Sequence, residues 1–238
     1  MLKQIFMSSP SYGFIFIEKK KFRDYDLFSS KEEALYTISK LKVWYGSTRE
    51  FNDDIKGKII LGMQCEFIDI YTGDKIISNV HGGELTGDDI ELYELELKNN
   101  DYIHKFYMNT DRYLTYMKIL TKKGKCIECG ENNEDTQRNI EINYLQKPHM
   151  INCFFGYYNN FGMNALGFRY ISRFNFILFS LLEIFRLKHN LKTNEEERKK
   201  WENPENFKKL SLKMQAIVKI CDLENILFNR IIGYYFSY

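Results

Sequence analysis

The sequence has little of what marks a membrane-spanning or nucleic-acid-binding protein. No apolar run reaches the roughly 18 to 20 residues needed to cross a bilayer. The nearest, Phe174 to Leu187, is interrupted by Glu183 and Arg186. The 34 basic and 32 acidic residues leave a net charge of +2, so no overall field attracts nucleic acid or an anionic membrane. These absences predict a chain with no transmembrane segment, whose partner is recognised locally.

A secretory signal and a disulfide framework are not indicated either. The N-terminus lacks the continuous apolar segment of a signal peptide. The five cysteines are an odd number and lie far apart, at Cys65, Cys126, Cys129, Cys153 and Cys221. We therefore expect a reducing, intracellular location, either cytoplasmic or in a cytoskeletal or axonemal assembly; a mitochondrial location would also fit.

The pattern of the sequence changes twice along its length. Residues 1–39 are expected to be an N-terminal extension, in which Ser30 to Glu33 has capping-box spacing and predicts a short helix that ends before Val43. Residues 40–172 contain strand-like alternation. Residues 173–238 are expected to be an α-helical extension, because apolar residues recur at three- and four-residue spacing from Phe207 to Cys221.

The centre of the chain carries the most informative motifs, which are strands punctuated by glycine. In order, they are His81-Gly82-Gly83, a strand opened by Asp101-Tyr102-Ile103, a strand from Leu114 to Leu120, the turn Thr121 to Lys125 before Cys126 to Cys129, then Ile151 to Gly156, and Met163 to Phe168. Such short runs between turn residues predict β hairpins.

This succession resembles jacalin-like lectin domains, whose later half closes on a Phe-Phe-Gly segment followed by Leu-Asp-Ala-Ile-Gly. Here the corresponding residues are Phe154-Phe155-Gly156 and Met163-Asn164-Ala165-Leu166-Gly167. The resemblance covers about residues 40–171 and is faint in its first third. It implies a mainly β fold, the β prism, in which three antiparallel sheets surround a threefold pseudo-axis.

The resemblance also implies a place for a sugar, in a Gly-x-x-x-Asp loop before the last strand. A carboxylate there accepts hydrogen bonds from sugar hydroxyls. The alignment places Asn160 at the family's Gly and Asn164 at its Asp, so the loop is degenerate: Asn offers one carbonyl acceptor, and a side chain at position 160 restricts the backbone. If glycan binding is retained, the predicted site comprises Gly82, Gly83, Asn160, Phe161, Gly162, Met163 and Asn164. Tyr157, Tyr158 and Phe161 could stack on a sugar ring, although a 16% aromatic content makes such residues common everywhere in the chain.

A zinc site is a weaker alternative. Cys126, Cys129, His149 and Cys153 have the residue types and spacing of a tetrahedral site. However, an offset of three on a strand sends two side chains to opposite faces, so ordinary cysteines are favoured and no metal or cofactor is expected. Asp88 and Asp89, with Glu84 as a third carboxylate, are too few for a calcium site and are read as a polar turn.

Catalysis and polyanion binding have little support in the sequence. The four histidines stand apart at His81, His104, His149 and His189, and no nucleophile or phosphate-loop motif occurs, so we expect no enzyme. Lys19-Lys20-Lys21 could contact a polyanion. Because Glu18 and Asp24 flank this run, a solvated turn is the favoured interpretation.

Two functions remain open. The prediction is a non-catalytic structural subunit of a large intracellular assembly whose partners are other protein subunits, because the apolar C-terminal helices and the aromatic end Tyr234 to Tyr238 need burial. The alternative is a carbohydrate-binding lectin of the jacalin-related type, with a glycan as partner.

Overall fold

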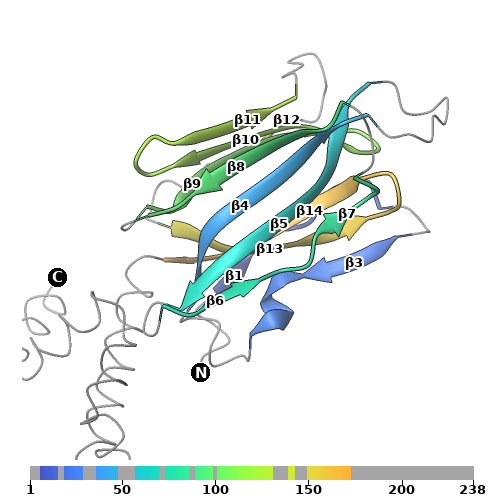
Figure 1. The fold of residues 1–238 in the computed structure, drawn as a ribbon. Helices are drawn as coiled ribbons and strands as arrows, with labels where there is room; N and C mark the ends of the chain where they lie inside the picture. Colours follow the sequence, from blue (N-terminus) through green and yellow to red (C-terminus); the bar gives the residue numbers. More distant parts are fainter. Residues whose placement is uncertain are drawn as a thin grey trace, which may run out of the picture. The chain divides into compact units, whose positions relative to one another are not determined.

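The computed structural model of the chain describes residues 6–15, 19–28, 36–47, 57–69, 73–85, 89–98, 101–130, 139–142 and 149–172 (Figure 1). The chain divides into two compact units, Met1–Ile68 with Lys75–Ile177, and Asp69–Asp74 with Leu178–Tyr238. The first unit carries the sheets, and most of the second lies outside the described residues. Within the described part, no helix is long and apolar enough to span a bilayer.

The first sheet joins the two ends of the first unit. Its strands are β1 (Phe6–Ser8), β2 (Tyr12–Gly13), β3 (Lys20–Arg23), β13 (His149–Tyr158) and β14 (Met163–Ser172). The order is β1-β14-β13-β3, β2 also pairs with β14, and every described pairing is antiparallel. The N-terminal strands therefore flank the hairpin that carries the predicted sugar loop. A short 3-10 helix, η2 (Asp24–Leu27), follows β3.

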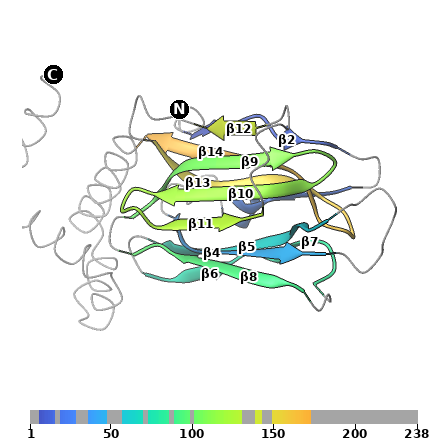
Figure 2. The ribbon, with the colours of Figure 1, turned by 90° about the horizontal axis from the view of Figure 1, so that it is seen from above.

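The second and third sheets are also antiparallel (Figure 2). The second contains β11 (Cys126–Cys129), β10 (Leu114–Thr121), β9 (Ile103–Thr110) and β12 (Asn139–Ile142), in that order. The third contains β6 (Lys75–Ile77), β5 (Ile59–Asp69), β4 (Tyr36–Gly46) and β8 (Glu91–Glu96), with β7 (His81–Gly82) also paired to β5. Three antiparallel sheets are the architecture that the sequence resemblance implied.

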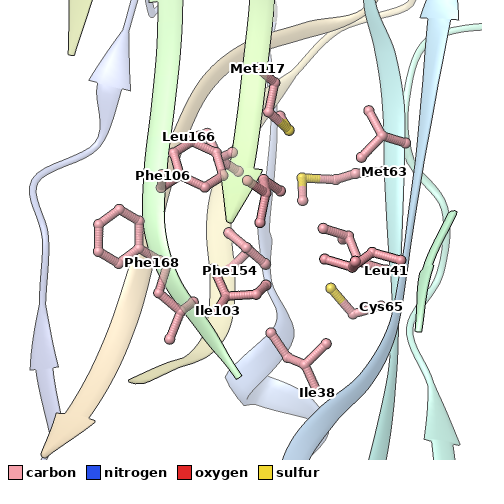
Figure 3. Close-up of a cluster of buried hydrophobic side chains, with 14 of the residues drawn as sticks. Ile38, Leu41, Met63, Cys65, Ile103, Phe106, Met117, Phe154, Leu166 and Phe168 are labelled. Atoms are coloured by element: carbon pink, nitrogen blue, oxygen red, sulfur yellow. The ribbon is translucent and has the colours of Figure 1, made fainter. Parts of the chain in front are cut away.

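The core lies where the inner faces of the three sheets meet (Figure 3). Leu41 and Phe67 from the third sheet, Phe106 from the second, and Phe154 and Phe168 from the first are fully buried. The Phe106 ring lies 5.9 Å from the ring of Phe154 and 6.0 Å from that of Phe168. Each such side chain contributes roughly 1.5–3 kcal/mol by leaving water. This shared core fixes the sheets relative to one another, and with them the turns at their ends.

The N-terminal region differs from the expectation. The predicted helix from Ser30 to before Val43 is wrong in its second half, because Tyr36–Gly46 is strand β4. Ile38, Leu41 and Val43 are buried, and their β-branched and apolar side chains fill the core from an extended backbone. Burial of this strand outweighs the local capping signal. Residues 29–35, and the predicted helices of residues 173–238, lie outside the described residues.

Most strands in the centre confirm the sequence-based expectation. β9 begins directly after Asp101 and Tyr102, β10 spans Leu114–Thr121, and β11 follows the predicted turn. Gly124 in that turn has a φ of 83°, a conformation that favours glycine. The turn is held by the buried carboxylate of Asp101, which accepts from Tyr102 N at 3.1 Å, Lys123 N at 3.0 Å and Thr121 Oγ1 at 2.9 Å.

Candidate functional site

Three turns that are far apart in the sequence meet at one end of the first unit. They are residues 83–85 after β7, residues 111–113 between β9 and β10, and residues 159–162 between β13 and β14. Glu84 N donates a hydrogen bond to Asn160 O at 3.0 Å, and Asn159 Nδ2 donates to Tyr113 Oη at 3.1 Å. We call this surface the loop end; one strand end from each sheet contributes to it.

The Asn159 side chain organises the middle turn. Its Oδ1 accepts hydrogen bonds from Phe161 N at 3.0 Å and Gly162 N at 3.3 Å, while its backbone N–H donates to Gly162 O at 3.1 Å. Asparagine commonly holds a turn in this way, by mimicking a backbone group. The conformation of residues 159–162 is therefore set before any ligand arrives.

Gly83 allows two of the turns to touch. A Cβ at this position would lie 2.5 Å from Asn160 O and 2.5 Å from the carbonyl carbon of Phe161. Any side chain would push the two turns apart. The structure thus brings the predicted residue Gly83 beside residues 160–162, as the resemblance implied, whereas Gly82 lies against Leu61 and Gly62 of β5.

Asn164, the residue aligned with the family's acid, is not on the surface. Its side chain is fully buried, and its Nδ2 donates a weak hydrogen bond to Arg112 O at 3.4 Å. Its Oδ1 has no hydrogen-bond partner within the described residues. The segment after β2 lies against it, because Phe14 N donates to Asn164 O at 3.2 Å. Met163 is fully buried as well, so these two predicted residues are closed off from a ligand in this conformation.

Other polar side chains face solvent at the loop end. Glu84, Asn160, Asp111 and Arg112 are exposed, and Glu84 has no ion-pair partner in the described part of the chain. The half-exposed Phe161 ring packs edge-to-face on Tyr113, with ring centroids 6.4 Å apart. The surface therefore offers two carboxylates, an amide and a guanidinium around an aromatic edge. Such groups can exchange several directed hydrogen bonds with a polyhydroxylated ligand.

The two other predicted stacking residues have different environments. Tyr157 is half-buried on the outer face of the first sheet, with the Lys19 ammonium 4.9 Å from its ring centroid. Tyr158 is half-buried toward the core and lies 6.2 Å from the Phe22 ring, centroid to centroid. Of the three, only Phe161 belongs to the loop end.

His81 connects this site to the N-terminal segment. Its Nε2 lies 2.9 Å from Oδ1 of Asp24, a carboxylate that is 1% exposed, and its ring stacks on Phe22 with centroids 4.2 Å apart. Asp24 also hydrogen-bonds Cys65, and burial, followed by the charge of Asp24, raises the pKa of the Cys65 thiol well above its usual range. This thiol stays protonated and is a poor nucleophile. The cluster fixes η2 and β7 together.

The proposed zinc ligands do not converge. Cys126 is exposed and Cys129 is buried, so the two face opposite sides of β11, as the strand offset predicted. Burial raises the pKa of Cys129 to about 12. Cys153 lies in the core, and the side chain of His149 is outside the described set. The described residues contain no group of three or more His, Cys, Asp or Glu side chains arranged so that it could hold a metal ion.

Asp89, a residue of the candidate cation site, forms hydrogen bonds within the protein instead. Asp89 accepts hydrogen bonds from Ser47 N at 3.2 Å and Ser47 Oγ at 2.7 Å, and its pKa is lowered mainly by these bonds. Asp88 lies outside the described residues. Asp89 is therefore a turn-forming residue in this structure.

Two residues that organise the site were missed by the sequence analysis. Asn159 had a local signal, because an asparagine before Asn160, Phe161 and Gly162 is typical of an Asx turn. Tyr113 had no local sequence signal, since its hydrogen-bond partner Asn159 is 46 residues away along the chain. Glu84 was considered only as a cation ligand, and its exposed position beside Asn160 depends on the packing of two turns.

No family model and no curated protein matches the sequence. Among solved structures, the chain is similar to the Malaysian banana lectin, with 16% identity over 70% of this chain and 99% of that chain and a TM-score of 0.49. It is also similar to artocarpin in its mannotriose complex (11% identity, 69% and 96% covered, TM-score 0.49) and to a mannose-binding jacalin-related lectin from Ananas comosus (10%, 70% and 98%, 0.47). The β prism itself is established by the strand pairing of this chain.

Proposed function

We propose that this protein is a non-catalytic carbohydrate-binding protein whose ligand contacts the loop end. The observation that carries the proposal is the preorganised contact between residues 83–85, 111–113 and 159–162, held by Asn159 and by the Glu84 N to Asn160 O bond. Rigid polar surfaces bind sugars well because little conformational entropy is lost on association. The turns brought together include those that the sequence resemblance associates with a sugar.

The acceptor role shifts in this proposal from position 164 to Glu84. Asn164 is buried, whereas the Glu84 carboxylate is exposed at the loop end and has no ion-pair partner within the described residues. A carboxylate accepts hydrogen bonds from two adjacent hydroxyls, and bonds to a charged group are the stronger ones. Asn160 supplies both a donor and an acceptor beside it.

The experiment is a glycan array followed by titration of the best neutral glycan into wild type, E84Q and N160A. Both side chains are exposed, so the substitutions leave the core intact. Loss of a hydrogen bond to a charged group costs about 1.5–3 kcal/mol, which corresponds to roughly 10- to 150-fold weaker binding for E84Q. The matched control is E96Q, which removes an exposed carboxylate from β8 in the third sheet and is expected to bind like wild type. Wild type that binds no glycan, or E84Q and N160A variants that bind as wild type does, would refute the proposal.

The protein-subunit role expected from the sequence is a second candidate. Ile77 on edge strand β6 is 60% exposed and Leu92 on edge strand β8 is 48% exposed, so both edges of the third sheet present an apolar side chain. Exposed sheet edges can pair with another chain. The apolar C-terminal residues that motivated this role lie outside the described residues, so the loop end carries the stronger argument. Stable co-purification of other proteins with wild type, lost on I77K/L92K substitution, would support the subunit role.

A further inference from the structure

A row of cations lies along one edge of the first sheet. Lys20–Arg23 forms strand β3, which pairs with β13 in the register Lys21 with Tyr157 and Arg23 with Phe155. Phe22 points into the core and is 5% exposed, so Lys21 and Arg23 point to the outer face. The sequence-based interpretation of this run as a solvated turn is therefore wrong: it is a strand with a cationic outer face.

Of the two carboxylates that were expected to neutralise this run, Asp24 is turned away from it, and Glu18 lies outside the described residues. Asp24 is 1% exposed and bound to His81 inside the protein. Within the described residues, Lys19, Lys20, Lys21 and Arg23 form no ion pair with a carboxylate. This contrasts with the third sheet, where Lys40 and Lys42 both pair with Glu94 and Lys58 pairs with Glu91. The next acidic residue along the chain after Asp24 is Asp26.

Aromatic rings hold these cations in place. The Lys19 and Lys21 ammonium groups lie 4.9 Å and 5.8 Å from the Tyr157 ring centroid. The Arg23 and Arg169 guanidinium carbons lie 5.8 Å and 4.6 Å from the centroid of Tyr25. Each cation–π contact is worth about 0.5–1 kcal/mol at an exposed site. Two aromatic residues thus hold four cationic side chains on one face.

Gly167 helps to build the same face. A Cβ there would lie 2.5 Å from Cζ of Phe155, so the Phe155 ring covers the glycine backbone. The ring in turn packs edge-to-face on Tyr25, with centroids 6.2 Å apart. The cationic face is therefore a packed surface. The Phe155 ring supports Tyr25, and Tyr25 in turn contacts Arg23 and Arg169.

From this arrangement we infer that the outer face of β3 and β13 binds the acidic groups of a sulfated polysaccharide. Alternate residues on a strand are about 6.6–6.8 Å apart, so Lys19, Lys21 and Arg23 form a line of charges roughly 13–14 Å long. A linear polymer with regularly spaced sulfates matches such a line. The Tyr157 and Tyr25 rings already hold cations, whereas single-stranded nucleic acids stack their bases on open aromatic rings.

The choice of a polysaccharide rests on the proposed function. Lys20 pairs with Tyr158, the residue next to Asn159, so the cationic row begins beside the loop end. One carbohydrate chain can then place a neutral sugar ring at Glu84 and Asn160 and its sulfates along β3. Glu84 repels acidic groups, which orients the chain with its sulfates toward the lysines.

The test compares dextran sulfate with neutral dextran of the same length, measured by titration at 0.15 M salt. Wild type is expected to bind dextran sulfate and to bind dextran much more weakly. The variant K19Q/K21Q/R23Q is expected to lose about 10- to 100-fold in affinity, since several exposed charge contacts each contribute a few-fold. The conservative variant K19R/K21R keeps the charges and is expected to bind like wild type. The matched control K98Q/K122Q/K123Q removes three exposed lysines outside the first sheet and should bind as wild type does.

Three results would overturn the inference. One is equal binding of dextran and dextran sulfate. Another is an equal loss in the K98Q/K122Q/K123Q control, which would make net charge the cause. The third is equally tight binding, with the same dependence on Lys19, Lys21 and Arg23, of single-stranded DNA or of phosphatidylserine vesicles. Because E84Q and N160A weaken neutral glycans without removing a cation of β3, failure of the loop-end proposal is measured separately.

Discussion

Replacement of Asn164 by aspartate tests whether position 164 is a ligand position or a buried structural one. The side chain is fully buried, its Nδ2 faces Arg112 O at 3.4 Å, and no donor among the described residues reaches its Oδ1. In N164D the amide donor becomes an oxygen, so a charged carboxylate would face the Arg112 carbonyl with no compensating hydrogen bond. Leaving such a charge buried and unpaired costs about 3–5 kcal/mol. We expect the free energy of unfolding at pH 7 to fall by about this amount.

The same reasoning predicts a pH dependence with a definite sign. Burial disfavours the charged form, so the pKa of the introduced carboxyl is raised in the folded state. Below the unfolded-state value of about 4, the carboxyl is protonated in both states and can donate to Arg112 O, so N164D should be nearly as stable as wild type. As the pH rises above that value, the penalty grows by about 1.4 kcal/mol per pH unit until the folded-state pKa is passed.

Urea unfolding of both proteins at pH 4.5, 5.5 and 7 measures this penalty. The matched control is N160D, which adds the same carboxyl at an exposed position four residues earlier and should change stability by less than about 0.5 kcal/mol at every pH. The reasoning fails if N164D is as stable as N160D at pH 7, or if N164D binds a glycan that wild type does not. Either result would mean that position 164 is open to solvent.

Two further predictions concern the turn after β10 and the cysteines. D101A removes a buried carboxylate that accepts three hydrogen bonds and should lower the free energy of unfolding by about 2–4 kcal/mol; an unchanged urea midpoint would contradict this. Iodoacetamide at pH 8 should modify Cys126 in the native protein, while Cys65, Cys129 and Cys153 react only after unfolding, because they are buried and burial holds the Cys129 pKa at about 12. Peptide mapping by mass spectrometry separates the four sites, and early labelling of Cys129 would contradict the orientation of β11.

Local sequence patterns predicted much of the described fold. The motifs around Ile103, Leu114 and Phe154 predicted strands correctly because their alternation matches the burial of one sheet face. The pattern failed at Tyr36–Gly46, where the cap-like Ser30 to Glu33 suggested a helix but core burial selected a strand. It also failed at β3, because Asp24, one of the two carboxylates expected to neutralise the run, has a side-chain direction that sequence does not specify.

The candidate site was predicted in part. The closeness of Gly83 to residues 160–162 followed from the sequence resemblance and is confirmed. The burial of Asn164 was not foreseen, because it depends on Phe14 and the strand before it, which the resemblance did not cover. The hydrogen bond between Asn159 and Tyr113 joins two sheets and has no local signature. A single sequence does not predict contacts between turns that are far apart along the chain.

The neutral residue at position 164 and the packing of the N-terminal strands have one physical explanation. Gly13 lies so close to β14 that a Cβ there would be 2.3 Å from Asn164 O, so the segment from Tyr12 to Phe14 closes the start of that strand. Once closed, the position cannot hold an unpaired carboxylate at low cost. A neutral amide with one weak hydrogen bond is tolerated there, as is observed. Any affinity for a sugar must then come from side chains around the closed position, and the described residues place an exposed carboxylate, Glu84, and a row of cations, Lys19 to Arg23, next to the same hairpin.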